Sequence, residues 1–482
     1  MSALAAISMA AVAAVAIVTQ DQAPLRAAPR DSAARQAVLA PGDALEVRGE
    51  RLGYLQVYDH RRERAGYVLA SQVRGTSLAP AEANDLLAVL RFVRDTPGQE
   101  SLGIGYAAAY LKAAPAKAID AEPFDALGTM AERLARRSNQ RQPRGADTVA
   151  TQLEVAASYG VQFNSYEQDG TLRLCYDGDA FRRVFALPAT PEQRARAALA
   201  LTRADCIDPA LRPLERAQLD QWRAALLDRL DNAQWQALAE PWRNRLRMRR
   251  AGVWSAVAYA QARAADPAAA QQSAQRAIDE LAAVQPGELG DDDRAAYSDA
   301  ALRVGAVRWA AVAAPAQPKA GRDGLALVSA PGEPGQSCVM LVDAKHDAAA
   351  PLARRCTYGI AWMASASLNP NGRAAALAVQ PLAGWRELWV FRREGSSWSV
   401  ATLPPGADDP SLGYLEFAGW VPGGQKLLMA REVRADGQFK RSFEVASLAA
   451  LNVEKQAGAP QSLALFAKWQ DPAWKRATIS LR

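Results

Sequence analysis

The apolar side chains of this 482-residue chain change their spacing twice. In residues 37–74 they alternate with polar ones over short stretches that end in Gly or Asp, which is the period of short strands. In residues 80–314 they recur every three or four positions in segments rich in Ala, Leu and Arg, which is the period of amphipathic helices. Alternation returns in residues 324–482. The sequence therefore predicts a multidomain protein that runs from strands to helices and back to strands.

Chain length and two Pro- and Ala-rich stretches indicate where these domains begin and end. A chain of 482 residues is too long for one hydrophobic core, so several domains are expected. We predict a small SH3-like β-barrel over 36–77, a mainly α-helical domain over 78–314 and an all-β domain over 324–482. The Pro- and Ala-rich stretches 24–35 and 315–323 are interpreted as linkers. One β-hairpin is predicted inside the helical domain, because Gln168-Asp169-Gly170 separates two alternating stretches.

The first residues predict export. Ala3 to Val18 form an apolar run that is shorter than a membrane span but suits the central region of a signal peptide. We interpret residues 1–23 as a signal peptide, with cleavage after a small residue such as Ala16 or Ala23. The alternative is an uncleaved segment that anchors the protein to the inner membrane. Either form places the rest of the chain in the periplasm or elsewhere outside the cytoplasm.

The four cysteines agree with this location. They fall into two close pairs, Cys175 with Cys206 and Cys338 with Cys356. Pairing within each local pair costs the least loop-closure entropy, so these two disulfides are expected. Disulfides persist in oxidising compartments. The alternative is four buried thiols in a cytosolic protein.

Residues 36–76 resemble the bacterial SH3 (SH3b) module. The resemblance is carried by Ala40-Pro41-Gly42-Asp43-Ala44-Leu45-Glu46-Val47, Gly53-Tyr54-Leu55-Gln56-Val57 and Gly66-Tyr67-Val68-Leu69-Ala70-Ser71-Gln72-Val73. The Asn-Val-Arg strand that usually opens this family's barrel is not found before Gln36. The resemblance implies a shallow aromatic groove that binds peptides, often those of the cell wall, with Tyr54, Tyr58 and Tyr67 as its residues. The alternative is that these tyrosines fill the core of the barrel.

The C-terminal region contains an approximate repeat. Leu368-Asn369-Pro370-Asn371-Gly372 and Trp420-Val421-Pro422-Gly423-Gly424 each precede an aliphatic strand, and they lie about 52 positions apart. A Pro-x-Gly turn before a strand at this period resembles the blades of periplasmic β-propellers. Because the region is short for a closed propeller, a small sheet domain with blade-like hairpins is the alternative.

The scarcity of histidine excludes several kinds of enzyme. Only His60 and His346 are present, so neither a zinc site with several His ligands nor a nucleophile with a His base beside it is expected. We predict no catalytic residue, no metal and no cofactor. The alternative is a lytic enzyme that cleaves peptidoglycan through one carboxylic acid, because Glu100-Ser101 resembles the catalytic pair of lytic transglycosylases.

The densest positive charge lies between Trp242 and Arg250. Its arginines predict either a solvated helix face or contact with an anionic envelope surface: Arg243, Arg245, Arg247, Arg249 and Arg250. Nucleic acid is not expected as a partner of an exported protein. The sequence as a whole predicts a non-catalytic binding or scaffold protein of the envelope, whose partner is a cell-wall peptide or another envelope protein.

Overall fold

The structure, a computed structural model, describes residues 15–140, 146–168, 170–406 and 412–480. The chain divides into two compact units. Unit 1 contains the chain up to Leu211 together with Leu230–Ala237, and unit 2 contains Arg212–Arg229 and Leu238–Arg482. This division differs from the predicted boundaries at 77 and 315–323, because the N-terminal strands pack with the first helices and the later helices pack with the C-terminal strands.

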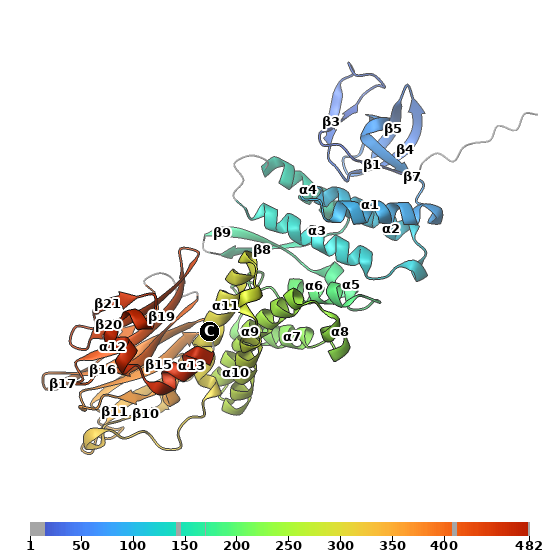
Figure 1. Cartoon of the computed structure of the whole chain (residues 1–482). Helices are drawn as coiled ribbons and strands as arrows, with labels where there is room; N and C mark the ends of the chain where they lie inside the picture. Colours follow the sequence, from blue (N-terminus) through green and yellow to red (C-terminus); the bar gives the residue numbers. More distant parts are fainter. Residues whose placement is uncertain (1–14, 141–145, 169, 407–411, 481–482) are drawn as a thin grey trace, which may run out of the picture. The chain divides into compact units, whose positions relative to one another are not determined.

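Unit 1 opens with a seven-stranded antiparallel sheet (Figure 1). Its strands are β1 (Val15–Val18), β2 (Ala23–Arg26), β3 (Arg35–Leu39), β4 (Ala44–Arg51), β5 (Tyr54–Asp59), β6 (Arg64–Leu69) and β7 (Val73–Thr76). The order is β3-β2-β6-β5-β4-β1-β7, and no pairing among the described residues joins β3 to β7. The predicted strands are present, but hydrogen bonds do not close them into a barrel.

The structure differs from the predictions for the N-terminal residues in two places. Residues 24–35 are not simply a linker, because Ala23–Arg26 forms β2 between β3 and β6, with Leu25 fully buried. Val15–Val18 forms β1, which pairs with both β4 and β7. Cleavage after Ala16 would cut β1, and cleavage after Ala23 would remove it. The predicted signal residues 1–14 lie outside the described part of the chain.

The sheet and the helices of unit 1 share packing. The helices are α1 (Ala83–Arg94), α2 (Glu100–Ala113), α3 (Glu122–Ser138), α4 (Ala146–Ser158), α5 (Asp179–Val184), α6 (Pro191–Leu201) and α8 (Asn232–Ala237). Ile17 of β1 belongs to the same hydrophobic core as Leu86 of α1 and Ile104 of α2. Small residues let α2 lie close to its neighbours, since a Cβ at Gly103 would stand 2.1 Å from Met130 Sδ.

The predicted hairpin and its disulfide are confirmed. β8 (Phe163–Gln168) pairs with β9 (Thr171–Tyr176). Cys175 on β9 is bonded to Cys206 after α6, with the two Cα atoms 5.8 Å apart. The bond therefore links the hairpin to the helix that follows it, as the spacing of the cysteines predicts.

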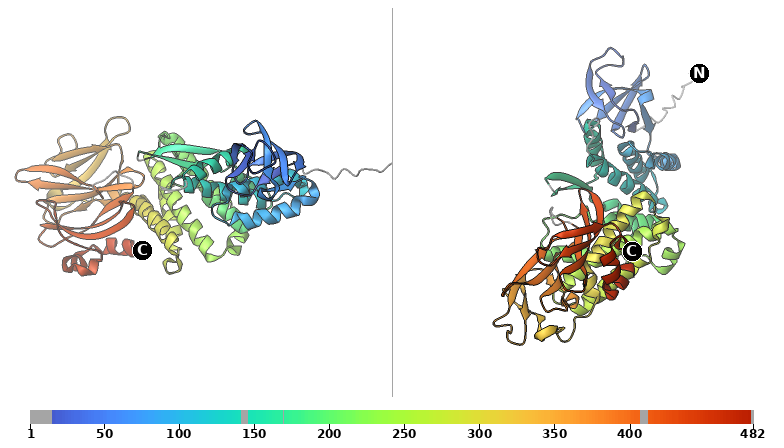
Figure 2. Two further views of the ribbon diagram at one scale, coloured as in Figure 1. Left: turned by 90° about the horizontal axis from the view of Figure 1, so that it is seen from above. Right: turned by 60° about the vertical axis from the view of Figure 1, so that its left-hand side comes forward.

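Unit 2 combines helices with two sheets (Figure 2). Its helices are α7 (Pro213–Leu227), α9 (Glu240–Arg263), α10 (Pro267–Ala282), α11 (Asp291–Val307), α12 (Ala464–Trp469) and α13 (Pro472–Ser480). One sheet contains β10 (Ala326–Pro331), β11 (Ser337–Val342) and β12 (Ala353–Thr357). Cys338 and Cys356 lie opposite each other on β11 and β12 and are bonded, so the second predicted disulfide is also confirmed.

The other sheet of unit 2 has nine strands. They are β13 (Ile360–Ala361), β14 (Ser367–Leu368), β15 (Ala374–Leu382), β16 (Trp385–Glu394), β17 (Ser397–Leu403), β18 (Gly413–Trp420), β19 (Lys426–Ala435), β20 (Gln438–Ser447) and β21 (Val453–Ala457). A short parallel pairing of β16 with β18 joins the two halves of the repeat. The repeats are therefore continuous in one sheet, which fits the sheet alternative.

The two repeated turns contact each other. The side-chain amide of Asn369 donates to Gly424 O at 3.2 Å, and that of Asn371 donates to Gly423 O at 2.8 Å.

The final residues differ from the all-β prediction, because α12 and α13 follow β21. Their Phe466 and Trp474 pack edge-to-face on Phe443 of β20. In the described part of the chain, no helix is long and apolar enough to span a membrane.

Candidate functional site

The three predicted ligand-binding tyrosines lie on one face of the β5–β6 hairpin. Tyr67 on β6 stands opposite Gln56, midway between Tyr54 and Tyr58 on β5. Side chains two positions apart on a strand share a face, so all three tyrosines share the face of Gln56. The hydrophobic core of the sheet is built from the alternate positions, including Val57 and Val68. Tyr58 and Tyr67 are therefore not core residues, whereas Tyr54 is buried.

The tyrosines differ in their surroundings. Tyr54 is only 6% exposed, and its hydroxyl donates to Asp31 Oδ1 at 2.5 Å. This hydrogen bond to a carboxylate raises the pKa of Tyr54 above its usual value. Tyr58 is half-buried between the Arg48 guanidinium, 4.3 Å from the ring centre, and the edge of the His60 ring. Tyr67 is also half-buried. Tyr58 and Tyr67 thus offer accessible ring surface, whereas Tyr54 mainly holds the loop that contains Asp31.

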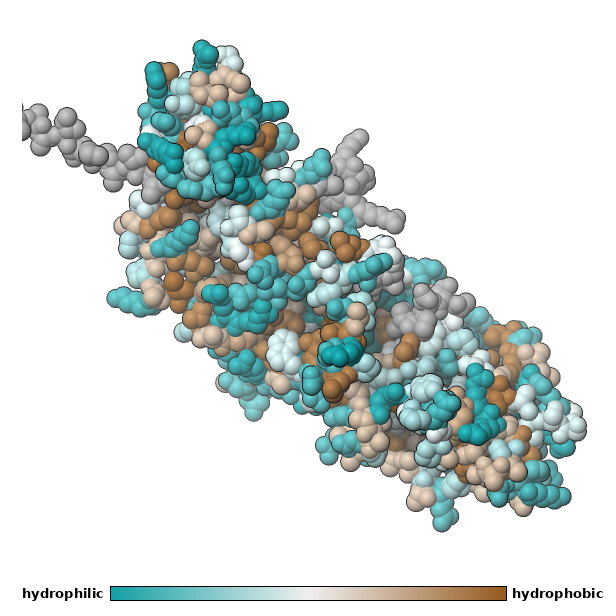
Figure 3. Space-filling view, turned by 180° about the vertical axis from the view of Figure 1, so that it is seen from behind, coloured by the Kyte–Doolittle hydropathy of each residue, from teal (hydrophilic) through white to brown (hydrophobic). Residues whose placement is uncertain are grey.

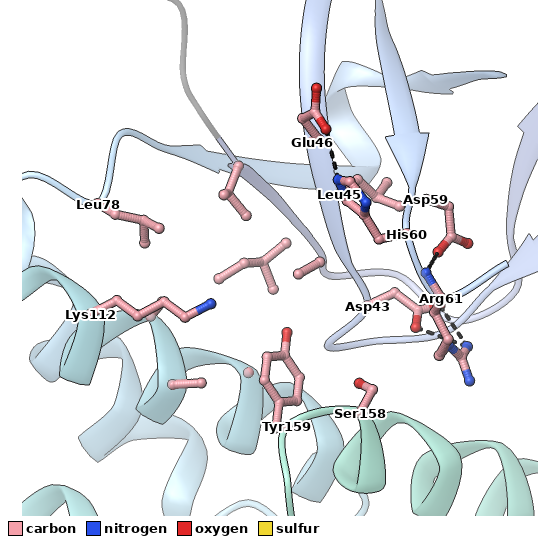
Figure 4. A pocket seen from close by; sticks show the side chains of 16 residues that line it. Asp43, Leu45, Glu46, Asp59, His60, Arg61, Leu78, Lys112, Ser158 and Tyr159 are labelled. Carbon is pink, nitrogen blue, oxygen red and sulfur yellow. Dashed lines mark hydrogen bonds and ion pairs between the residues drawn. The ribbon is translucent and has the colours of Figure 1, made fainter. Parts of the chain in front are cut away.

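A second feature of unit 1 is a cavity of about 530 Å³ between the sheet and helices α2 and α4 (Figure 4). Its lining comes from five elements and the loops beside them: Val15, Ile17, Asp43, Ala44, Leu45, Glu46, Asp59, His60, Arg61, Leu78, Gly105, Ala108, Ala109, Lys112, Ser158 and Tyr159. None of the three tyrosines of the hairpin face lines it. No motif in the sequence indicates this cavity.

Specific contacts fix the wall where the sheet meets the helices. The Tyr159 hydroxyl donates to Gly42 O at 2.6 Å, and Ser101 Oγ donates to Pro41 O at 2.7 Å. Gly42 has a φ of +94°, and a Cβ there would stand 2.3 Å from Ser101 O. The turn Pro41-Gly42-Asp43 therefore needs glycine in order to seat on α2. Burial raises the pKa of Tyr159, so its hydroxyl keeps its proton and remains a donor to Gly42.

Buried carboxylates organise the sheet side of the cavity. Asp43 pairs with Arg61 at 2.9 Å and with Arg62 at 3.1 Å, and Asp59 pairs with Arg62 at 2.6 Å. At the rim, His60 Nε2 lies 2.7 Å from Glu46 Oε2. His60 lies in the turn between β5 and β6, and 68% of its side chain is exposed. These charges are compensated within the sheet, which makes this wall a structural support.

Glu100 does not have the environment of a general acid in the described structure. Its carboxylate is fully buried at the start of α2 and pairs with Arg133 at 2.6 Å and with Arg137. It also accepts a hydrogen bond from Gly98 N. A general acid must reach the substrate, whereas this carboxylate is fully buried and both of its oxygens are held by arginines. The position of Glu100 therefore argues for a structural role.

The arginine-rich segment lies on α9 inside unit 2. Partners were found for four of its arginines: Arg243 and Arg247 pair with Glu240, Arg245 with Asp293, and Arg250 with Glu280. Arg249 is also engaged. The helix packs against α7, α10 and α11. The segment therefore does not form a row of uncompensated cations, which removes the main reason to expect an anionic surface as its ligand.

The described residues hold no group of three or more His, Cys, Asp or Glu side chains placed to bind a metal ion. No family model matches the chain, and comparisons with curated proteins and with solved structures found no match. What the protein does must therefore be inferred from its own residues.

Proposed function

We propose that this chain is an exported, non-catalytic protein of the bacterial envelope, and that its N-terminal sheet is an SH3b-like module that binds a cell-wall peptide through Tyr58 and Tyr67. Tyr54 supports the same face from below. The observation that carries the proposal is the shared face of the three tyrosines, turned away from the hydrophobic core. Aromatic rings that stand on such a surface supply contact area at low entropic cost.

Three further observations support the proposal. β2 contains Pro24-Leu25-Arg26 before Gln36, which supplies a strand in the place of the Asn-Val-Arg strand that opens SH3b modules. Two disulfides suggest an oxidising, extracytoplasmic environment. The hydrophilic side chains that cover much of the N-terminal sheet on the face drawn in Figure 3 suit a module that works in water.

Binding is tested by co-sedimentation of the full chain with purified peptidoglycan sacculi. The Tyr58→Ala, Tyr67→Ala double variant is expected to bind at least about tenfold more weakly, because hot-spot aromatic residues contribute 2 kcal/mol or more. Tyr358→Ala, which removes an exposed tyrosine of unit 2, is the matched control and should bind normally. Unchanged binding of the double variant would refute the role of this face.

The same incubation tests the enzymatic alternative. Soluble muropeptides that appear with the wild-type protein and disappear with Glu100→Gln would replace the proposal with a lytic activity. Export is tested separately with a reporter fused to the C-terminus of the full chain. Reporter activity confined to the cytoplasm would refute the proposed location.

A further inference from the structure

The cavity between the sheet and helices α2 and α4 has the size and lining of a ligand site. Its volume of about 530 Å³ falls within the usual range for small-molecule sites. Residues from β1, β4, α2 and α4 surround it, and all of them belong to unit 1. A site built on several packed elements holds its shape better than one built on a single loop.

Among the described residues, the charges around this cavity leave one cation without a salt bridge. Asp43 and Asp59 pair with Arg61 and Arg62, and Arg61 also pairs with Glu154 at 3.1 Å. Glu46 is shared between Arg48 and His60. Lys112 of α2 is the remaining charged residue in the lining, and no carboxylate of the described residues forms a salt bridge with it. Figure 4 shows its amine directed into the cavity.

The wall beside Lys112 is apolar. Val15 and Ile17 of β1, Leu78 before α1, and Ala108 and Ala109 of α2 line it. Apolar side chains of this kind suit a short aliphatic group. The Tyr159 hydroxyl donates its hydrogen bond to Gly42 O. Its oxygen can therefore still accept a hydrogen bond from a ligand N–H.

We infer that this cavity binds a small carboxylate with a short aliphatic body, with the carboxylate on Lys112 and the body against β1 and α2. Ligands of this class include the C-terminal residues of a short peptide and free aliphatic acids. An N–H next to the body would reach Tyr159, which favours the peptide terminus. The inference does not rest on the proposed function, because none of the hairpin tyrosines lines the cavity.

The test is isothermal titration of the full chain with N-acetyl-alanyl-alanine, its C-terminal amide and isobutyrate. The peptide acid is expected to bind saturably, and the amide about tenfold more weakly or worse, because it loses a charge-assisted hydrogen bond to Lys112. Isobutyrate separates the two sources of the carboxylate. If isobutyrate binds as tightly as the peptide acid, the site is assigned to free acids. If isobutyrate binds more weakly, the site is assigned to peptide termini.

Variants connect the binding to this cavity. Lys112→Met keeps the length of the side chain and removes the charge, so we expect about a tenfold loss for the peptide acid and no loss for the amide. Lys112→Arg should restore most of the binding. Lys117→Met, which removes an exposed lysine outside the lining, and Tyr67→Ala on the hairpin face are the matched controls.

Three results would overturn the inference. These are equal affinity for the peptide acid and the amide, unchanged binding by Lys112→Met, and the absence of saturable binding by any of the three probes. Because Lys112 is exposed on α2, its substitution should not unfold the chain, and an unchanged circular dichroism spectrum would confirm this.

Discussion

The two units differ in the charge that they bury most deeply. In unit 1 the carboxylates are buried: Asp43, Asp59, Glu100 and Asp125 expose at most 4% of their side chains. Their arginine partners keep 23–29% of their side-chain surface exposed: Arg61, Arg62, Arg133, Arg137 and Arg196. In unit 2, a guanidinium is the most deeply buried charge. Arg386 is fully buried and lies 3.6 Å from Glu416, which also pairs with the buried Arg308.

The difference follows from the geometry of the two groups. A carboxylate accepts hydrogen bonds at two oxygens, and arginine can reach it with a long apolar stem while its head stays in water. A buried guanidinium must find partners for five N–H donors. None of the three side-chain nitrogens of Arg386 has a hydrogen-bond partner among the described residues. Arg431 with Glu444 shows that unit 2 also contains the arrangement of unit 1.

The largest effect is expected from Glu416→Gln. It leaves Arg308 and Arg386 buried without their counter-charge, so the free energy of unfolding of unit 2 should fall by about 3–5 kcal/mol. Tryptophan fluorescence in urea measures this, because Trp235 is the one of the 12 tryptophans that lies in unit 1. Glu394→Gln removes an exposed carboxylate from its pair with Arg392 on the same sheet and should cost less than about 1 kcal/mol. Equal losses would show that burial does not set the cost here.

A pH effect should distinguish Asp125 from the other buried carboxylates of unit 1. Burial raises its pKa to about 6 despite its ion pair with Arg196, and its Oδ1 has no hydrogen-bond partner in the described structure. The folded state then binds more protons than the unfolded state between about pH 4 and pH 6. The stability of unit 1 should therefore fall as pH rises through this window, by about 3 kcal/mol in all.

Hydrogen exchange of α3 amides across this pH range, analysed as a free energy of opening, measures the effect. Asp125→Asn should remove most of the pH dependence. Hydrogen bonds and ion pairs with Arg203 hold the pKa of Asp205 at about 2. The stabilisation from Asp205 is therefore already complete at about pH 4 and does not change across the window. A variant that keeps the full pH dependence would assign the effect to another group.

Glu100→Gln should cost about 2 kcal/mol, less than Glu416→Gln. The variant loses two charge-assisted hydrogen bonds, but Arg133 and Arg137 can turn their exposed heads to water. Hydrogen exchange of α2 and α3 in the full chain measures the loss. If Glu100→Gln lowers stability as much as Glu416→Gln, solvent contact does not reduce the cost of removing the counter-charge from the partly exposed arginines of unit 1.

Features that depend on neighbours in the sequence were predictable. The disulfide partners Cys175 and Cys206 are only 31 positions apart, and the turn at Gly170 marks the β8–β9 hairpin. β1 was missed because its three buried residues continue an alanine-rich apolar run. What identifies it as a strand is pairing with β4 and β7, about 30 and 60 positions away. β2 was missed because Pro24 and Arg26 resemble a linker, although Leu25 is fully buried.

The two candidate sites also differ in whether neighbours in the sequence could reveal them. Alternation within the hairpin places Tyr54, Tyr58 and Tyr67 on one face, so the sequence could propose them together. The cavity unites Leu45, Lys112 and Tyr159 from distant parts of unit 1, and none of them carries a local signal. The ion pairs of the α9 arginines also depend on distant residues, because Arg245 pairs with Asp293 from another helix.

The smallest effect is expected from Arg386→Met. Burial lowers the pKa of Arg386 to about 10, which shows that its surroundings disfavour the charged form. Methionine fills similar space, removes the cost of desolvation and leaves Glu416 paired with Arg308. The stability of unit 2, measured by tryptophan fluorescence in urea, should therefore stay within about 1 kcal/mol of the wild type or rise. Arg308→Met, which takes a hydrogen-bonded partner from Glu416, should lower it clearly. A loss of more than about 2 kcal/mol for Arg386→Met would mean that this guanidinium is hydrogen-bonded in solution, and the contrast between the units would then disappear.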